Sequence, residues 1–250
     1  MKQIVHEKAQ LIETLDDNGI GILNMDQPYL TKEQLRTPCK IIRYGVDRDD
    51  VELKAIKVQV SKKGTDFIVV YQNEAIPMHT RLLGKQHVSN ILGAIACALE
   101  LGVSFSQLKE RVATLPEIPH RLQLRAVNHY HIIDNAYNSN PASAAYALEV
   151  LSQLQGRKIV MTPGFMDLGA FQDQAHYTFG KQIAICAQEV ILVGRHQIQS
   201  IYEGLIAAGY DRAHIYIASN REQAFSILHQ IVLAKDIVLI ENDLPVLWNR

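Results

Sequence analysis

The segment from Ile132 to Pro141 concentrates side chains that can bind a ligand. Its carboxylate, phenol and amide groups belong to Asp134, Asn135, Tyr137, Asn138 and Asn140. Two apolar residues precede this polar run, and a pattern typical of one apolar helix face follows it. A polar turn between a strand and a helix forms a crevice where open α/β sheets bind ligands, and the free N–H groups of the helix favour an anion. The same residues also suit an Asx-rich turn with a helix cap, so spacing alone leaves both interpretations open.

Two later polar clusters also stand where a strand is expected to end. One follows a strand at 158–162, and its residues are Asp167, Leu168 and Gly169, with His176 one turn into the next helix. The other follows a strand at 237–240 and begins with Glu241 and Asn242. We expect all three clusters at one edge of a parallel sheet, because ligand sites form at the C-terminal ends of its strands. For His176 alone, a place on the helix surface is the simpler interpretation.

Two clusters earlier in the chain could contact a nucleotide. Gly84 precedes a helix whose first turn carries His87 and Asn90, three residues apart and therefore expected to point the same way. An amide there could pair with the edge of a purine base, although helix capping is the simpler explanation. Arg121 follows two prolines and could clamp a phosphate with two hydrogen bonds, although a surface arginine is the commoner outcome.

Several familiar motifs are missing from the 250 residues. We find no G-x-x-x-x-G-K-[ST] phosphate loop, no complete dinucleotide fingerprint, no G-x-S-x-G and no H-E-x-x-H. The three cysteines are far apart and have no metal-binding spacing, which is typical of reduced structural thiols.

The elements that must position these clusters differ between the two halves of the chain. In the first half, the pattern predicts helices at 1–15, 29–36 and 87–101, and a further helix that begins after its cap Ser104 and ends near 114. It also predicts strands at 20–23 and 40–44 and a β-hairpin at 55–71. The second half alternates strands at 130–133, 158–162, 190–193, 214–217 and 237–240 with helices near 141–154, 172–187, 197–208 and 220–234. Such alternation predicts βαβ units and a doubly wound α/β fold with a parallel sheet covered on both faces.

Composition limits the possible classes of protein. The content is 48% hydrophobic and 20% charged, which is typical of a globular protein, and the net charge of −1 argues against nucleic acid or an anionic membrane as a partner. No apolar run reaches the roughly 20 residues of a membrane helix, and the polar N-terminus does not resemble a signal peptide. We therefore expect a cytoplasmic protein. Pro116 and Pro119 mark a linker, which predicts domains at 1–117 and 118–250.

Taken in order, the clusters resemble motifs of the Mur ligase family, most of all its D-alanyl-D-alanine-adding branch. That branch carries G-x-H-N-x-x-N-x-x-A-A, a proline-x-arginine-leucine junction, D-D-S-Y-N-A-N-P and G-D-M-x-E-L-G. The counterparts here are Gly84–Ala94, Pro119–Leu122, Asp134–Pro141 and Pro163–Gly169, and 23–28 resembles L-N-A-D-D-P. The resemblance covers essentially the whole chain.

The resemblance implies a fold, an activity and a set of site residues. Residues 1–117 would be the C-terminal part of a central ATPase domain, and 118–250 a C-terminal Rossmann-like domain. The family uses ATP and Mg²⁺ to activate a carboxylate as an acyl phosphate, which an amino group then attacks, in peptidoglycan precursor synthesis for the cell wall. The resemblance makes Lys8 a carbamylated lysine that helps hold Mg²⁺. It assigns ATP binding to His87, Asn90, Arg121, Asp134, Asn135, Tyr137 and Asn138. Substrate contacts fall to Asn140, Asp167, Leu168, Gly169, His176, Glu241 and Asn242.

The sequence differs from the family motifs at three places, and these differences bear on the predicted activity. Where the family has His-Asn, this chain has Gln86-His87, and where the family has the second aspartate of D-D, it has Asn135. The acidic run from Glu241 to Pro245 replaces the family's K-G-S-R. The acidic run would disfavour a carboxylate-bearing ligand, so the acceptor could differ from D-alanyl-D-alanine. The phosphate loop and the sugar-nucleotide domain precede Lys8 in the family, so we expect this polypeptide alone not to catalyse ligation. Two alternatives stay open: a split ligase whose phosphate loop comes from a separate chain, and a non-catalytic α/β binding module.

Overall fold

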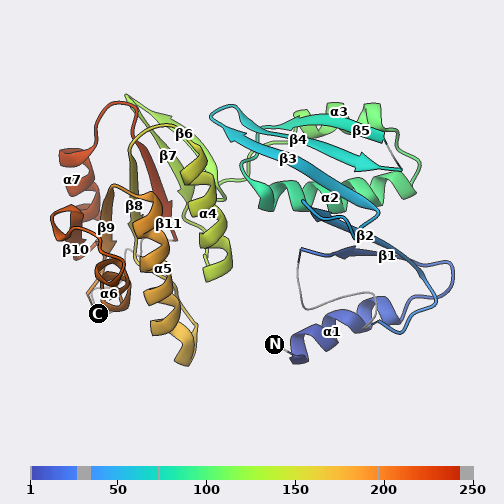
Figure 1. The fold of residues 1–250 in the computed structure, drawn as a ribbon, viewed down its shortest axis with the longest axis horizontal. Coiled ribbons are helices and arrows are strands. Elements are labelled where there is room, and N and C mark those ends of the chain that lie inside the picture. The colour runs from blue at the N-terminus through green and yellow to red at the C-terminus, as the bar shows by residue number, and fades with distance from the viewer. Residues whose placement is uncertain (1, 27–34, 73, 196, 243–250) are drawn as a thin grey trace. The chain divides into compact units, whose positions relative to one another are not determined.

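The computed structural model describes residues 2–26, 35–72, 74–195 and 197–242 (Figure 1). The chain divides into two compact units, residues 1–116 and 117–250, and each is described by itself. The helix expected at 29–36 lies largely outside the described residues.

The first unit is a five-stranded mixed sheet with helices packed on it. Its elements are α1 (Lys2–Glu13), β1 (Ile20–Asn24), β2 (Lys40–Val46), β3 (Leu53–Ser61), β4 (Gly64–Tyr71), β5 (Glu74–Thr80), α2 (Lys85–Glu100) and α3 (Phe105–Ala113). The strand order is β1-β2-β3-β4-β5, parallel from β1 to β3 and antiparallel from β3 to β5. The predicted hairpin is confirmed, whereas the edge strand β5 was not predicted from the sequence.

Local chemistry explains why the hairpin and the helices form where they do. Gly64 has φ +127°, and a Cβ there would lie 2.0 Å from the carbonyl oxygen of Thr80, so only glycine fits beside the neighbouring strand. The apolar face of α2 covers the sheet through a helical repeat of buried residues, which are Val88, Ile91, Leu92 and Ile95. Ser104 caps α3 in a reciprocal capping box with Gln107, as expected.

The second unit is a six-stranded sheet with helices on both faces. Its elements are β6 (Gln123–Val127), β7 (Tyr130–Asn135), α4 (Pro141–Gln153), β8 (Lys158–Thr162), α5 (Gln172–Cys186), β9 (Glu189–Val193), α6 (Gln199–Ala207), β10 (Ile215–Ala218), α7 (Arg221–Ile231) and β11 (Ile237–Glu241), with short 3₁₀ turns at Gly169–Phe171 and Arg212–His214. The order is β10-β9-β8-β11-β7-β6, and only β6 is antiparallel to its neighbour. The parallel sheet predicted from the alternation is therefore confirmed for five strands. The sixth, β6, was missed.

Burial follows this architecture. Every residue of β9 and β11 is buried, as expected for central strands covered on both faces. Helix α7 covers the face that carries Ile159, Met161 and Ile191, whereas α4 and α5 pack together on the other side, with α4 against β11.

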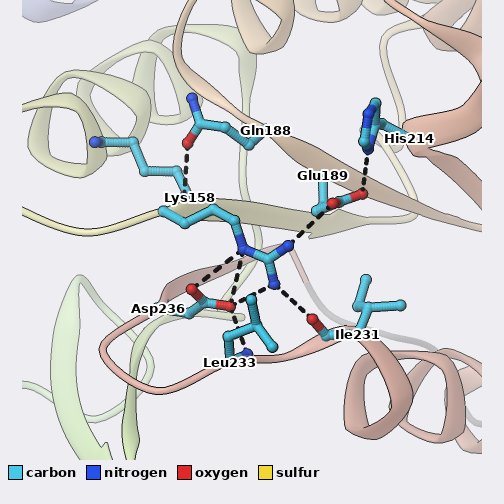
Figure 2. Close-up of polar contacts among 8 residues, drawn as sticks. Lys158, Gln188, Glu189, His214, Ile231, Leu233 and Asp236 are labelled. Atoms are coloured by element: carbon cyan, nitrogen blue, oxygen red, sulfur yellow. Dashed lines mark hydrogen bonds and ion pairs between the residues drawn. The ribbon is translucent and has the colours of Figure 1, made fainter.

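A charged network ties together the N-terminal edge of this sheet (Figure 2). Arg157, just before β8, bonds to Asp236 at 2.8 Å and to Glu189 at 3.1 Å, and it donates to the carbonyl of Ile231. Glu189 also contacts His214 Nδ1 at 3.1 Å. Both carboxylates are buried, so one guanidinium joins the starts of β8, β9 and β11 to the end of α7.

Candidate functional site

Three strands of the second unit bring the later polar clusters to one edge. β11 lies between β7 and β8 and is parallel to both, and Asn135 stands directly opposite Glu241. The segments that follow these strands therefore leave the sheet side by side at its C-terminal edge. We call the segment 135–140 the β7 turn and the segment 163–169 the β8 loop.

The β7 turn ends in a helix cap. The side-chain oxygen of Asn140 accepts hydrogen bonds from the N–H groups of Ala142 at 3.1 Å and Ser143 at 3.0 Å, and Pro141 occupies the first helical position. The capping interpretation is thus confirmed for Asn140. Any contact with a substrate would use its remaining amide nitrogen.

Beneath the β7 turn lies a buried polar network. Asn135 donates from Nδ2 to Glu241 Oε2 at 2.9 Å and accepts from the Leu122 N–H at 3.1 Å. Ser139 donates its hydroxyl proton to Glu241 Oε1. Burial raises the pKa of the Glu241 carboxyl to about 7.

Asn242 joins the β7 turn to the β8 loop. Its side-chain oxygen accepts from the Ser139 N–H at 3.1 Å, and its Nδ2 donates to the Gly164 carbonyl at 2.6 Å. Asn242 has φ +70°, a left-handed conformation that asparagine tolerates better than most residues.

His176 supports the β8 loop from below. Its Nε2 accepts from the Phe165 N–H at 2.7 Å, and burial lowers the pKa of its ring. A Cβ at Gly164, where φ is +84°, would lie 2.7 Å from the same nitrogen. His176 and Glu241 are both fully buried. We therefore revise the expectation that they contact a substrate: their influence on the site is indirect.

Asp134 is itself only 6% exposed, and the groups that reach the surface lie around it and on the β8 loop. Asp134 Oδ2 is 3.0 Å from His120 Nδ1 and 3.6 Å from Arg125 Nη1, so a basic pair flanks the carboxylate. The guanidinium of Arg121 lies 4.3 Å from the ring centroid of Tyr137, as in a cation–π contact. The exposed site residues of the second unit are Arg121, Tyr137, Asn138, Asn140, Asp167 and Gly169, and Leu168 is half-buried.

The remaining site residues lie on the first unit. Asn90 is exposed on α2, but His87 is only 6% exposed, so the two do not share an environment as their spacing suggested. A three-residue step leaves them about 60° apart around the helix, which here spans the border between the buried and exposed faces. Lys8 is exposed on α1.

Asn24 and Asp26 lie in the segment 23–28 that the resemblance singled out, but the sequence did not predict that they form a polar cluster with Ser89 of α2. Ser89 donates to Asp26 Oδ2 at 2.8 Å and accepts from Asn24 Nδ2 at 3.1 Å, and Asp26 Oδ1 accepts from the Val46 N–H. Burial and the nearby Asp26 raise the pKa of Tyr44 beside this cluster. The signal was visible: polar Asn24 and Asp26 follow an apolar strand, as in the other clusters.

A cavity of about 490 Å³ lies at the opposite edge of the second unit's sheet, near Arg157 and Glu189. Both charged groups already bind protein partners, and the rest of the wall combines three alanines and Gly209 with Gln188, Tyr210, Asp211 and His214. We assign this cavity no ligand. Among the described residues, no group of three or more His, Cys, Asp or Glu side chains gathers for a metal ion. Nor is any described helix long and apolar enough to span a membrane.

The fold and the site define an α/β protein with polar clusters at strand C-terminal ends, the usual position of ligand sites in this class. Residues 1–98 match the model of the Mur ligase middle domain, and residues 120–241 match the Mur ligase glutamate ligase domain. The chain belongs to the Mur ligase family, of which it carries the middle and C-terminal domains.

Relatives from several bacteria agree with this assignment. The UDP-N-acetylmuramoyl-tripeptide–D-alanyl-D-alanine ligase of Buchnera aphidicola is 27% identical over 241 residues, covering 95% of this chain and 50% of its own. The Escherichia coli enzyme of the same name is 24% identical over 195 residues, covering 77% and 43%. A 2,6-diaminopimelate-adding ligase of Chlamydia caviae is 26% identical, covering 96% and 50%. The chain spans about half the length of the curated relatives it matches.

Solved structures show the same fold. MurF from Acinetobacter baumannii superposes with a TM-score of 0.81 at 19% identity, covering 96% of this chain and 52% of its own. MurF from Thermotoga maritima, solved in complex with ADP, gives 0.83 at 17% identity, covering 97% and 54%.

Proposed function

We propose that this chain supplies the C-terminal part of the middle domain, and the C-terminal domain, of an ATP-dependent amide ligase. The ligase would join an amino acid or dipeptide to a UDP-MurNAc-peptide-like carboxylate in peptidoglycan precursor synthesis in the cytoplasm. The observation that carries the proposal is the alignment of polar clusters at the C-terminal strand ends of a Mur ligase fold. The names of the relatives support this substrate class.

Asp134, which is only 6% exposed, and the exposed groups around it suit the nucleotide. Asp134 can accept hydrogen bonds from ribose hydroxyls, Arg121 can bind phosphate oxygens, and the Tyr137 ring offers an apolar face. On the first unit, the Asn90 amide would pair with the base, and His87, which is buried three residues earlier on the same helix, would support it. The β8 loop, with exposed Asp167 and Gly169, would face the amino-group acceptor.

The reaction divides into two balanced steps. The terminal phosphoryl group of ATP passes to the substrate carboxylate, which yields an acyl phosphate and ADP. The acceptor amine then attacks the acyl carbon and phosphate leaves. Positioning and charge neutralisation dominate such phosphoryl transfer. The 250 residues contain no phosphate-loop motif. We therefore expect these residues alone to contribute binding groups but no turnover.

Mg²⁺ belongs to this proposal through Lys8. Carbamylation of its exposed amine would create a hard oxygen ligand of the kind that Mg²⁺ prefers. A carbamate supplies only part of the coordination that Mg²⁺ requires, so the other ligands would come with the phosphate loop and the nucleotide phosphates.

The direct test is phosphate release from ATP in the presence of UDP-MurNAc-peptide and D-alanyl-D-alanine or single amino acids. The purified chain is assayed alone and mixed with a second polypeptide that contains a phosphate loop, such as the N-terminal half of a MurF-type relative. We expect acceptor-dependent release only in the mixture, and a loss of at least tenfold with Arg121→Ala. Release by the chain alone would contradict the account. So would an inactive mixture when the relative's own two halves are active together.

A further inference from the structure

The carboxyl group of Glu241 occupies an unusual position in the second unit. It is fully buried at the end of β11, and its two hydrogen-bond donors, Asn135 Nδ2 and Ser139 Oγ, are both neutral. In the described part of the chain, no lysine, arginine or histidine forms an ion pair with it. Burial of a carboxylate without a positive partner costs free energy, and such a group commonly binds a proton and becomes neutral instead.

The surrounding network can accommodate either protonation state. With Glu241 ionised, the Ser139 hydroxyl donates to it. With Glu241 protonated, its O–H can donate to Ser139 Oγ, and the Ser139 proton can turn to Ser143 Oγ, 3.0 Å away. Ser143 already donates to the Asn140 carbonyl at 3.0 Å, so the reversed chain ends at the cap of α4 without an orphaned donor.

The same carboxyl group lies where the two halves of the site join. Asn135 and Ser139 belong to the β7 turn, and Asn242, the next residue after Glu241, bonds to both Ser139 and Gly164. A change of hydrogen-bond direction at Glu241 therefore reaches the β7 turn directly and the β8 loop through Asn242.

Other titratable groups near this edge have partners of their own. Asp134 is flanked by His120 and Arg125, and His176 accepts from Phe165 beneath the β8 loop. Asp167 is exposed on the β8 loop and Arg121 stacks on Tyr137. Glu241 and Asn135, in contact with each other, are both positions where the chain departs from the family motifs.

We propose that Glu241 is a positioning residue whose gain or loss of a proton reverses its hydrogen bond with Ser139 and thereby adjusts the β7 turn and the β8 loop together. Ligands held by both segments then bind with a pH dependence that Glu241 sets. The raised pKa of about 7 for this carboxyl supports the geometric argument. The proposal concerns the geometry of the edge and does not rest on the site binding a nucleotide.

The test is an NMR titration of the labelled full chain from pH 4 to pH 9. It follows the side-chain carboxyl carbon of Glu241 and the backbone amides of 135–140 and 163–165. We expect the carboxyl carbon to titrate at about 7, against about 4.3 for an ordinary glutamate. The amides of both segments should follow the same midpoint. Glu241→Gln should abolish that shared transition.

Two control variants separate Glu241 from its neighbours. His120→Gln removes the exposed histidine beside Asp134 and should leave the shared transition in place. Ser139→Ala removes the hydroxyl that links Glu241 to the β7 turn and should weaken the response of the amides of both segments, while the Glu241 carboxyl carbon still titrates. A midpoint near 4.3 for Glu241 would overturn the proposal, as would a shared transition that survives in Glu241→Gln. If that variant does not fold, the carboxyl carbon of the unmodified chain still decides the midpoint.

Discussion

At the scale of single residues, burial of Glu241 links folding to pH. The folded state binds a proton with a pKa of about 7, whereas an unfolded glutamate does so at about 4.3. Between these values the folded state holds a proton that the unfolded state releases, so this contribution is full below about pH 4.3 and is lost as pH rises to about 7. The loss is on the order of 3 kcal/mol.

Glu241→Gln should remove this dependence, because glutamine does not titrate. We expect wild type and variant to have similar urea unfolding free energies at pH 5, and the variant to be more stable at pH 8. A parallel change of both proteins between these two pH values would contradict the raised pKa.

At the scale of elements, one guanidinium holds several strand starts together. Arg157→Ala leaves Asp236 and Glu189 buried without their cation, and removal of one partner of a buried pair typically costs about 3–5 kcal/mol. Thermal and urea unfolding measure this loss. Lys40→Ala breaks an ion pair whose lysine is largely exposed, and should cause a much smaller change. Equal effects of the two substitutions would contradict the structural role of Arg157.

The accuracy of the sequence predictions depended on how strongly each element signals its type. Five strands of the second unit were placed correctly because their apolar runs alternate with long helical patterns. β5 contains Pro77 and polar residues, and β6 is short with exposed positions, so both edge strands lacked a clear apolar signal. The strand-end clusters were visible as polar runs after apolar ones. The full burial of Glu241 and His176 could not be predicted from the sequence, because it depends on which elements pack around them in the fold.

At the scale of the whole molecule, the chain combines two Mur ligase domains, and each of the two units carries some of the predicted site residues. The second unit carries most of the residues that we assign to the nucleotide. Its hydrogen-bond network is contiguous and runs from Leu122 through Asn135, Glu241, Ser139 and Asn242 to Gly164. We therefore propose that the C-terminal edge of this sheet faces the nucleotide.

Titration of the ¹⁵N-labelled chain with ADP tests that claim most directly. We predict weak, Mg²⁺-independent binding, with chemical-shift changes centred on Arg121 and residues 134–138. Asp134→Asn should weaken it about tenfold, through loss of a charged acceptor for the ribose hydroxyls. Asp167→Asn, a matched change of an exposed carboxylate on the β8 loop, should leave the affinity unchanged. Shift changes confined to other segments, or none at millimolar ADP, would contradict the account.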